Sequence, residues 1–125
     1  MDNKTKGILD LCRISNLPTV LSNCVGSWLI AGAALGDSNL LVLVLGAALF
    51  YSGGMVMNDV FDVAFDNEFR PERPIPSGIV SNRLAVILTL IFMVSGLTLM
   101  ILGGAQFLLV LALSIVIIAY NFFHK

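Results

Sequence analysis

The chain has 125 residues, of which 58% are hydrophobic and only 12% are charged. A soluble domain usually carries about a quarter charged residues, so this composition excludes most soluble classes and favours an integral membrane protein. The formal net charge is −1, and no basic patch of the kind that binds nucleic acid is present.

Uncharged, mostly apolar intervals of about 20 residues are the sequence signal for membrane-spanning helices. Residues 14–36 and 38–58 are two such intervals. From 84 to 124 no formal charge occurs, and this stretch is about twice as long as one span requires. Gly103-Gly104 divides it into 84–102 and 106–123. The sequence therefore predicts one all-α membrane domain over 1–125, a helical bundle with four transmembrane helices.

The basic residues predict the orientation. With four spans, all seven fall on one side of the membrane: Lys4, Lys6, Arg13, Arg70, Arg73, Arg83 and Lys125. Because basic residues are retained on the cytoplasmic side, both termini and the 59–83 loop are expected in the cytoplasm of a multi-pass cell-membrane protein.

The segment between the second and third spans carries most of the polar chemistry. If the second helix continues beyond Asn58, then Asn58, Asp62 and Asp66 lie on one face, and Asp59 lies close to that face. Like charges on one face repel each other unless a cation lies among them. Hard oxygen ligands suit Mg²⁺, and nearby arginines suit phosphate oxygens. The pattern indicates a Mg²⁺-bridged diphosphate site, and the alternative is a solvated acidic loop neutralised by its own arginines.

Two motifs in this segment resemble those of the UbiA superfamily of intramembrane prenyltransferases. Asn58-Asp-x-x-Asp62-x-x-x-Asp66 is similar to the first aspartate-rich motif of that family, and Arg70-Pro-x-Arg73-Pro-Ile-Pro-Ser-Gly78 is similar to the loop that follows it. The likeness extends over the chain and includes the Asn16-Leu-Pro-Thr19 opening of the first helix. The resemblance implies transfer of an isoprenyl group from a prenyl diphosphate donor to a hydrophobic acceptor, typically aromatic, within the lipid bilayer.

The resemblance also implies roles for individual residues. The Mg²⁺ ligands would be Asn58, Asp59, Asp62 and Asp66. The catalytic group would comprise Asp62, Asp66, Arg70 and Arg73, and the substrate-binding group would comprise Asn58, Arg70, Arg73, Tyr120 and Lys125. Asn16 and Asn23 belong to a polar stripe on the first helix. This stripe would either line the substrate cavity or supply hydrogen bonds between helices.

The chain departs from the family pattern in one respect. Family members fold as bundles of about nine membrane helices, whose backbone polar groups are paired within the helices, and they carry a second aspartate-rich motif. No aspartate follows Asp66 here. We therefore expect a fragment or half-enzyme that is inactive alone, with a second polypeptide or further chain supplying the missing half. The alternatives are a non-catalytic membrane protein that binds prenyl diphosphate or divalent cations, and a transport or scaffold protein that binds cations alone.

Three smaller signals concern packing. Gly32-x-x-x-Gly36 is a signature of closely packed membrane helices. Ser81 follows a proline-rich stretch and is predicted to cap the third apolar helix. Ser114 and Asn121 are seven residues apart and are expected to share an inward face of the fourth helix.

Overall fold

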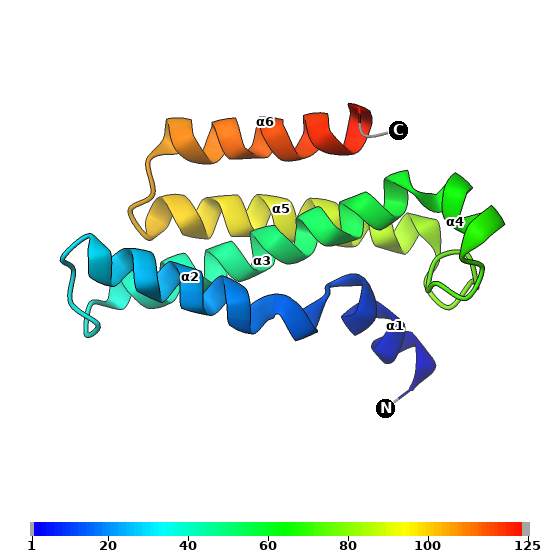
Figure 1. Cartoon of the computed structure of the whole chain (residues 1–125), viewed down its shortest axis with the longest axis horizontal. Helices are drawn as coiled ribbons and strands as arrows, with labels where there is room; N and C mark the ends of the chain where they lie inside the picture. Colours follow the sequence, from blue (N-terminus) through cyan, green and yellow to red (C-terminus); the bar gives the residue numbers. More distant parts are fainter. Residues whose placement is uncertain (1, 124–125) are drawn as a thin grey trace.

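A computed structural model describes residues 2–123 and confirms the all-α class. The described part consists of α1 (Asn3–Leu11), η1 (Ile14–Asn16), α2 (Leu17–Ile30), α3 (Ser38–Phe61), α4 (Val63–Phe69), α5 (Asn82–Leu102) and α6 (Phe107–Phe123). α2, α3, α5 and α6 run side by side as an elongated bundle, whereas α1 and α4 lie at one end of it (Figure 1).

Within residues 2–123, two helices are long and apolar enough to cross a membrane. They are α3, with 24 residues and a mean hydropathy of 2.1, and α5, with 21 residues and a mean hydropathy of 2.6. At 1.5 Å per residue these helices measure about 36 and 32 Å, against about 30 Å for the hydrocarbon core of a bilayer. α2 and α6 are shorter, with 14 and 17 residues. Leu90, Ile91 and Val94 of α5 are exposed, which suits a surface solvated by lipid.

α3 and α5 approach each other closely through glycines. A Cβ atom added to Gly96 would lie 2.5 Å from the backbone nitrogen of Phe50, and one added to Gly46 would lie 2.7 Å from that of Met100. Glycine is therefore required at these two positions for the helices to pack at this distance. The prediction that Gly32 and Gly36 form a packing surface is wrong. α2 ends at Ile30, so both glycines lie in the following turn, and a Cβ on either would meet no atom within 4 Å.

A small core fixes the end of the bundle that carries α1 and α4. Leu11 and Cys12, from the end of α1, are buried together with Val56 of α3 and with Ile75 and Val80 of the 70–81 loop. Burial raises the pKa of the Cys12 thiol, so that this group stays neutral. Because α1 and the loop share this core, they are packed together against α3.

The helix boundaries follow the sequence signals. Ser81 caps α5 as predicted, and its Oγ accepts a hydrogen bond of 3.3 Å from the backbone N–H of Leu84. α5 ends at Leu102, and Gly104 adopts a φ of +96° that L side chains rarely adopt. The chain then reverses into α6, where Ser114 and Asn121 are both buried, in agreement with their predicted inward face.

Candidate functional site: an aspartate–arginine cluster beside an apolar cleft

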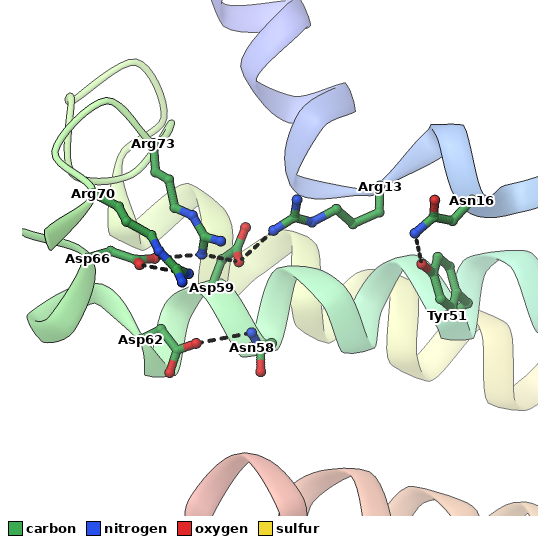
Figure 2. A network of polar contacts seen from close by, with 9 residues as sticks. All are labelled: Arg13, Asn16, Tyr51, Asn58, Asp59, Asp62, Asp66, Arg70 and Arg73. Carbon is green, nitrogen blue, oxygen red and sulfur yellow. Dashed lines mark hydrogen bonds and ion pairs between the residues drawn. The ribbon is translucent and has the colours of Figure 1, made fainter. Parts of the chain in front are cut away.

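The acidic segment is bent at Asp62. α3 ends at Phe61, Asp62 has φ −85° and ψ 0°, and α4 begins at Val63. Backbone hydrogen bonds continue across the bend, from the Asp62 N–H to the Asn58 carbonyl and from the Asp66 N–H to the Asp62 carbonyl. The bend differs from the continuous helix that would place Asn58, Asp62 and Asp66 on one face. Asp66 lies beside Asp59, seven residues earlier, and both carboxylates face the loop arginines (Figure 2).

Arg73 bridges the two buried carboxylates of the segment. Its Nη1 donates hydrogen bonds of 3.2 Å to Asp59 Oδ1 and 2.8 Å to Asp66 Oδ2. The side chains of Asp59 and Asp66 are only 6% and 1% exposed. Buried charges require paired partners, and a single guanidinium serves both here. This bridge fastens the 70–81 loop to α3 and α4.

Two further arginines flank the bridge. Arg70 Nη1 lies 3.8 Å from Asp66 Oδ1, and its guanidinium stands 5.6 Å from the ring centroid of Phe65. Arg13, which precedes α2, places Nη2 3.6 Å from Asp59 Oδ1 (Figure 2). Sequence reasoning used Arg13 only to orient the membrane domain. No spacing signal links it to Asp59, because the two residues are brought together by tertiary packing.

Asn58 and Asp62 form a separate pair. Asn58 Nδ2 donates a hydrogen bond of 3.1 Å to Asp62 Oδ2. Figure 2 shows this pair on the side of α3 that faces α6, away from the three arginines. The four predicted metal ligands are therefore divided into two pairs, one bound to arginine and one facing α6.

An apolar cleft of about 240 Å³ lies between α3 and α6 and includes Asn58 in its lining. Its walls are mostly apolar, with Phe50 and Gly54 on α3 and Val116 and Ile117 on α6. The polar groups Tyr51, Tyr120 and Asn121 also face it. Among residues 2–123, no group donates a hydrogen bond to the buried Oδ1 of Asn121. This combination of apolar walls and a few polar groups is typical of small-molecule sites.

The remaining predicted substrate residues are divided between the cleft and α2. Asn16 donates a hydrogen bond of 3.2 Å from Nδ2 to the hydroxyl oxygen of Tyr51, which ties the start of α2 to α3. This contact fits the interhelical role of the polar stripe. Tyr51 also lines the cleft, and sequence reasoning missed this residue. Asn23 is exposed on α2. Tyr120 lines the cleft, whereas Lys125 lies outside the described residues.

The donor atoms test the fit of a divalent cation. Within residues 2–123, no three acidic, histidine or cysteine side chains are placed to share one ion. Asp59 and Asp66 are already bridged by Arg73, and the buried Asp66 Oδ1, which accepts no hydrogen bond among the described residues, lies 3.8 Å from Arg70 Nη1. Asn58 lines the cleft, and Asp62 is hydrogen-bonded to it on the side of α3 that faces α6. They suit Mg²⁺, which keeps several waters and takes one or two protein ligands together with substrate phosphates.

The all-α fold of the described residues, with two apolar helices of membrane-spanning length, is that of a helical membrane protein. Residues 18–125 match the UbiA prenyltransferase family, and the chain belongs to this family. Members of this family are embedded in membranes, and the two apolar helices of this chain agree with a membrane protein.

Three curated relatives that are similar to this chain carry the name digeranylgeranylglyceryl phosphate synthase. The relative from Metallosphaera sedula is 44% identical over 87 residues, which cover 69% of this chain and 31% of that protein. Those from Methanothrix thermoacetophila and Ignicoccus hospitalis are 36% and 41% identical, over 71% and 74% of this chain and 34% and 30% of theirs. The chain thus spans about a third of the length of these relatives. No solved structure matches the chain significantly.

Proposed function

We propose that the chain forms the diphosphate-binding part of a prenyltransferase that moves an isoprenyl group from a prenyl diphosphate to an acceptor within the membrane. The observation that carries the proposal is the Asn58–Asp62 pair at the edge of an apolar cleft. An isoprenyl diphosphate has a matching shape, with a highly charged head and an apolar tail. Its head would lie at Asn58 and Asp62, and its tail between α3 and α6.

The polar residues divide into two roles in this proposal. Asn58 and Asp62 would hold Mg²⁺, which supplies positive charge to the diphosphate oxygens when it is bound. Asp59 and Asp66 hold the guanidinium groups of Arg73 and Arg70 at the same end of α3. Because these arginines lie on the side of α3 away from the Asn58–Asp62 pair, their role in this proposal is to fix the 70–81 loop, and they would add only longer-range positive charge near the departing diphosphate.

The reaction that this arrangement supports is an alkyl substitution. The bond between the allylic carbon and the diphosphate oxygen breaks, and its electron pair leaves with the diphosphate. The acceptor then forms a bond to the carbon and loses a proton. The apolar walls of the cleft, including Phe50 and Ile117, would exclude water that otherwise captures the allylic cation.

The names of the relatives favour a particular substrate class. Their shared name says that these relatives make a glyceryl phosphate that carries two geranylgeranyl groups. We infer a geranylgeranyl diphosphate donor and a glyceryl phosphate lipid acceptor for this chain, in place of the aromatic acceptor expected from the wider family. The acceptor atom would then be a hydroxyl oxygen, and the product bond an ether.

The topology and composition of the site also belong to this proposal. We infer four spans near 14–36, 38–58, 84–102 and 106–123, with the acidic segment and both termini at the cytoplasmic face. Asn58 and Asp62 supply two metal ligands, and no aspartate follows Asp66. We therefore infer that turnover needs acidic ligands from further chain or from a second polypeptide.

The test is Mg²⁺-dependent binding of a non-hydrolysable geranylgeranyl diphosphate analogue to the purified chain in detergent. Asp62→Ala should abolish saturable binding, whereas Glu68→Gln should leave it unchanged, because Glu68 is an exposed acid on α4. Binding that Asp62→Ala does not weaken would contradict the assignment. Binding without turnover, even beside a longer relative, would favour the non-catalytic alternative, and Mg²⁺ binding without the analogue would favour a cation-binding protein.

A further inference from the structure

Arg13 has an unusual backbone conformation. Among the residues that the structure describes, it is the one non-glycine residue with a positive φ, with φ 50° and ψ 45° in the left-handed region. A side chain with a Cβ atom is disfavoured there. Such conformations persist where the surrounding structure imposes them, and they concentrate at functional positions.

The left-handed turn joins two elements that are fixed independently. On one side, Leu11 and Cys12 are 1% and 5% exposed in the core shared with α3 and the 70–81 loop. On the other side, Asn16 begins the segment leading into α2 and is hydrogen-bonded to Tyr51 of α3. Arg13 lies between these two attachments, and its guanidinium reaches the carboxylate of Asp59 (Figure 2).

Asp59 therefore receives two guanidinium groups on one oxygen. Arg73 Nη1 lies 3.2 Å and Arg13 Nη2 lies 3.6 Å from Asp59 Oδ1. Because Arg73 also binds Asp66, and Asp66 lies beside Arg70, the charges alternate along a continuous row: Arg13, Asp59, Arg73, Asp66 and Arg70. We call these five residues the charge ladder. It contains three positive groups and two negative groups, so that Arg13 leaves it net positive by one.

We propose that Arg13 is a positioning residue that uses its left-handed turn to deliver a guanidinium to Asp59, which keeps Arg73 in its bridging place and the charge ladder net positive. Arg13 does not line the cleft between α3 and α6, so it acts through Asp59 and Arg73 and not by direct contact there. The part of this proposal that concerns diphosphate affinity rests on the proposed function, and the part that concerns the loop does not.

The alternative is that only the turn matters and the charge is incidental. The Arg13 side chain is 41% exposed, and exposed ion pairs usually contribute little to stability. Two substitutions separate the turn from the charge. Arg13→Gly removes the guanidinium and relaxes the left-handed backbone, whereas Arg13→Lys keeps the charge and retains the backbone cost.

The experiment compares Arg13→Gly, Arg13→Gln and Arg13→Lys with Arg83→Gln, which removes an exposed arginine at the start of α5. The first measurement is hydrogen exchange at Ser77 and Val80, whose N–H groups bond to loop carbonyls. The second is affinity for the geranylgeranyl diphosphate analogue with Mg²⁺. We expect Arg13→Gly and Arg13→Gln to speed exchange and weaken binding by about 2- to 5-fold, the scale of an exposed ion pair, and Arg13→Lys to recover most of both.

Each other outcome has a definite meaning. If Arg13→Gly keeps the hydrogen-exchange rates and the analogue affinity of the unsubstituted chain, the proposal is overturned, because the turn alone would then suffice. If Arg13→Lys speeds exchange and weakens binding as much as Arg13→Gln does, a role based on charge is overturned. The same conclusion follows if Arg83→Gln loses as much affinity as the Arg13 variants. Faster exchange in the variants, combined with no analogue binding even by the unsubstituted chain, would support the positioning of the loop and reject the proposed function instead.

Discussion

Arg73 donates a hydrogen bond of 2.8 Å to Asp66, whose side chain is 1% exposed at the end of an apolar helix bundle. The same nitrogen also binds Asp59, so a single guanidinium holds two carboxylates that would otherwise repel each other. Two of the four predicted metal ligands are thus paired by arginine.

Arg73→Ala should lower the free energy of unfolding by about 3 kcal/mol or more. The substitution leaves Asp59 and Asp66 buried without their shared partner, and breaking a buried ion pair from one side is strongly destabilising. Unfolding in detergent, followed by circular dichroism, would measure the loss. Arg83→Ala is the matched control, because Arg83 is exposed and should change stability by less than about 0.5 kcal/mol. Equal losses in the two variants would show that the bridge does not hold the fold.

Chelation should separate ligand binding from folding. Without ligand, EDTA should leave the melting temperature of the chain unchanged, because Arg73 and not a metal satisfies Asp59 and Asp66. With the diphosphate analogue at 100 times its Kd, Mg²⁺ should add about 2.7 kcal/mol of stability, and EDTA should remove it. A fall in melting temperature on adding EDTA to the ligand-free chain would mean that a tightly bound metal is part of the fold.

Gly96→Ala should destabilise the chain by about 1–3 kcal/mol, the usual cost of overpacking. The new Cβ would lie 2.5 Å from the backbone nitrogen of Phe50, so α3 and α5 would have to separate. Gly26→Ala is the control. No atom lies within 4 Å of a Cβ at Gly26 in α2, and this change should be neutral or stabilising by up to about 1 kcal/mol. Unfolding curves of the two variants in one detergent would measure the difference in their free energies of unfolding. Equal free energies would mean that α3 and α5 do not pack at Gly96.

Substitution of Gly54 should alter which donors the cleft accepts. Gly54 lies one helical turn before Asn58, and a Cβ there would stand 3.7 Å from Ile117 Cγ2, an ordinary contact. Gly54→Ala should therefore be tolerated, whereas Gly54→Phe should fill the cleft. Competition between diphosphate analogues with one and with four isoprene units would measure the effect. We expect Gly54→Phe to weaken the binding of the long analogue by more than tenfold and to leave the binding of the short analogue nearly unchanged. A similar loss of affinity for both analogues would mean that the tail does not lie in this cleft.

Much of the fold follows from local pattern. The lack of charge over 84–124, the Gly103-Gly104 break and the Ser81 cap together specify α5 and the start of α6. The same holds for the family resemblance, because the spacing of Asn58, Asp62 and Asp66 is a property of the chain alone. Hydrophobicity, caps and breakers act within a few residues, and for this reason the sequence is sufficient to read them.

Other features were decided only by tertiary structure. The spacing of the motif favours one acidic face, but tertiary contacts divide it, because Asp59 and Asp66 are buried against Arg73 of the loop whereas Asn58 and Asp62 bond to each other. Gly32 and Gly36 have the spacing of a packing motif, yet Gly46 and Gly96 make the close contact, since these two face each other across α3 and α5. Arg13 meets Asp59 although the two are 46 positions apart in the sequence. Which polar groups pair, and which small residues touch, depends on the arrangement of helices distant in sequence, and local pattern does not contain that information.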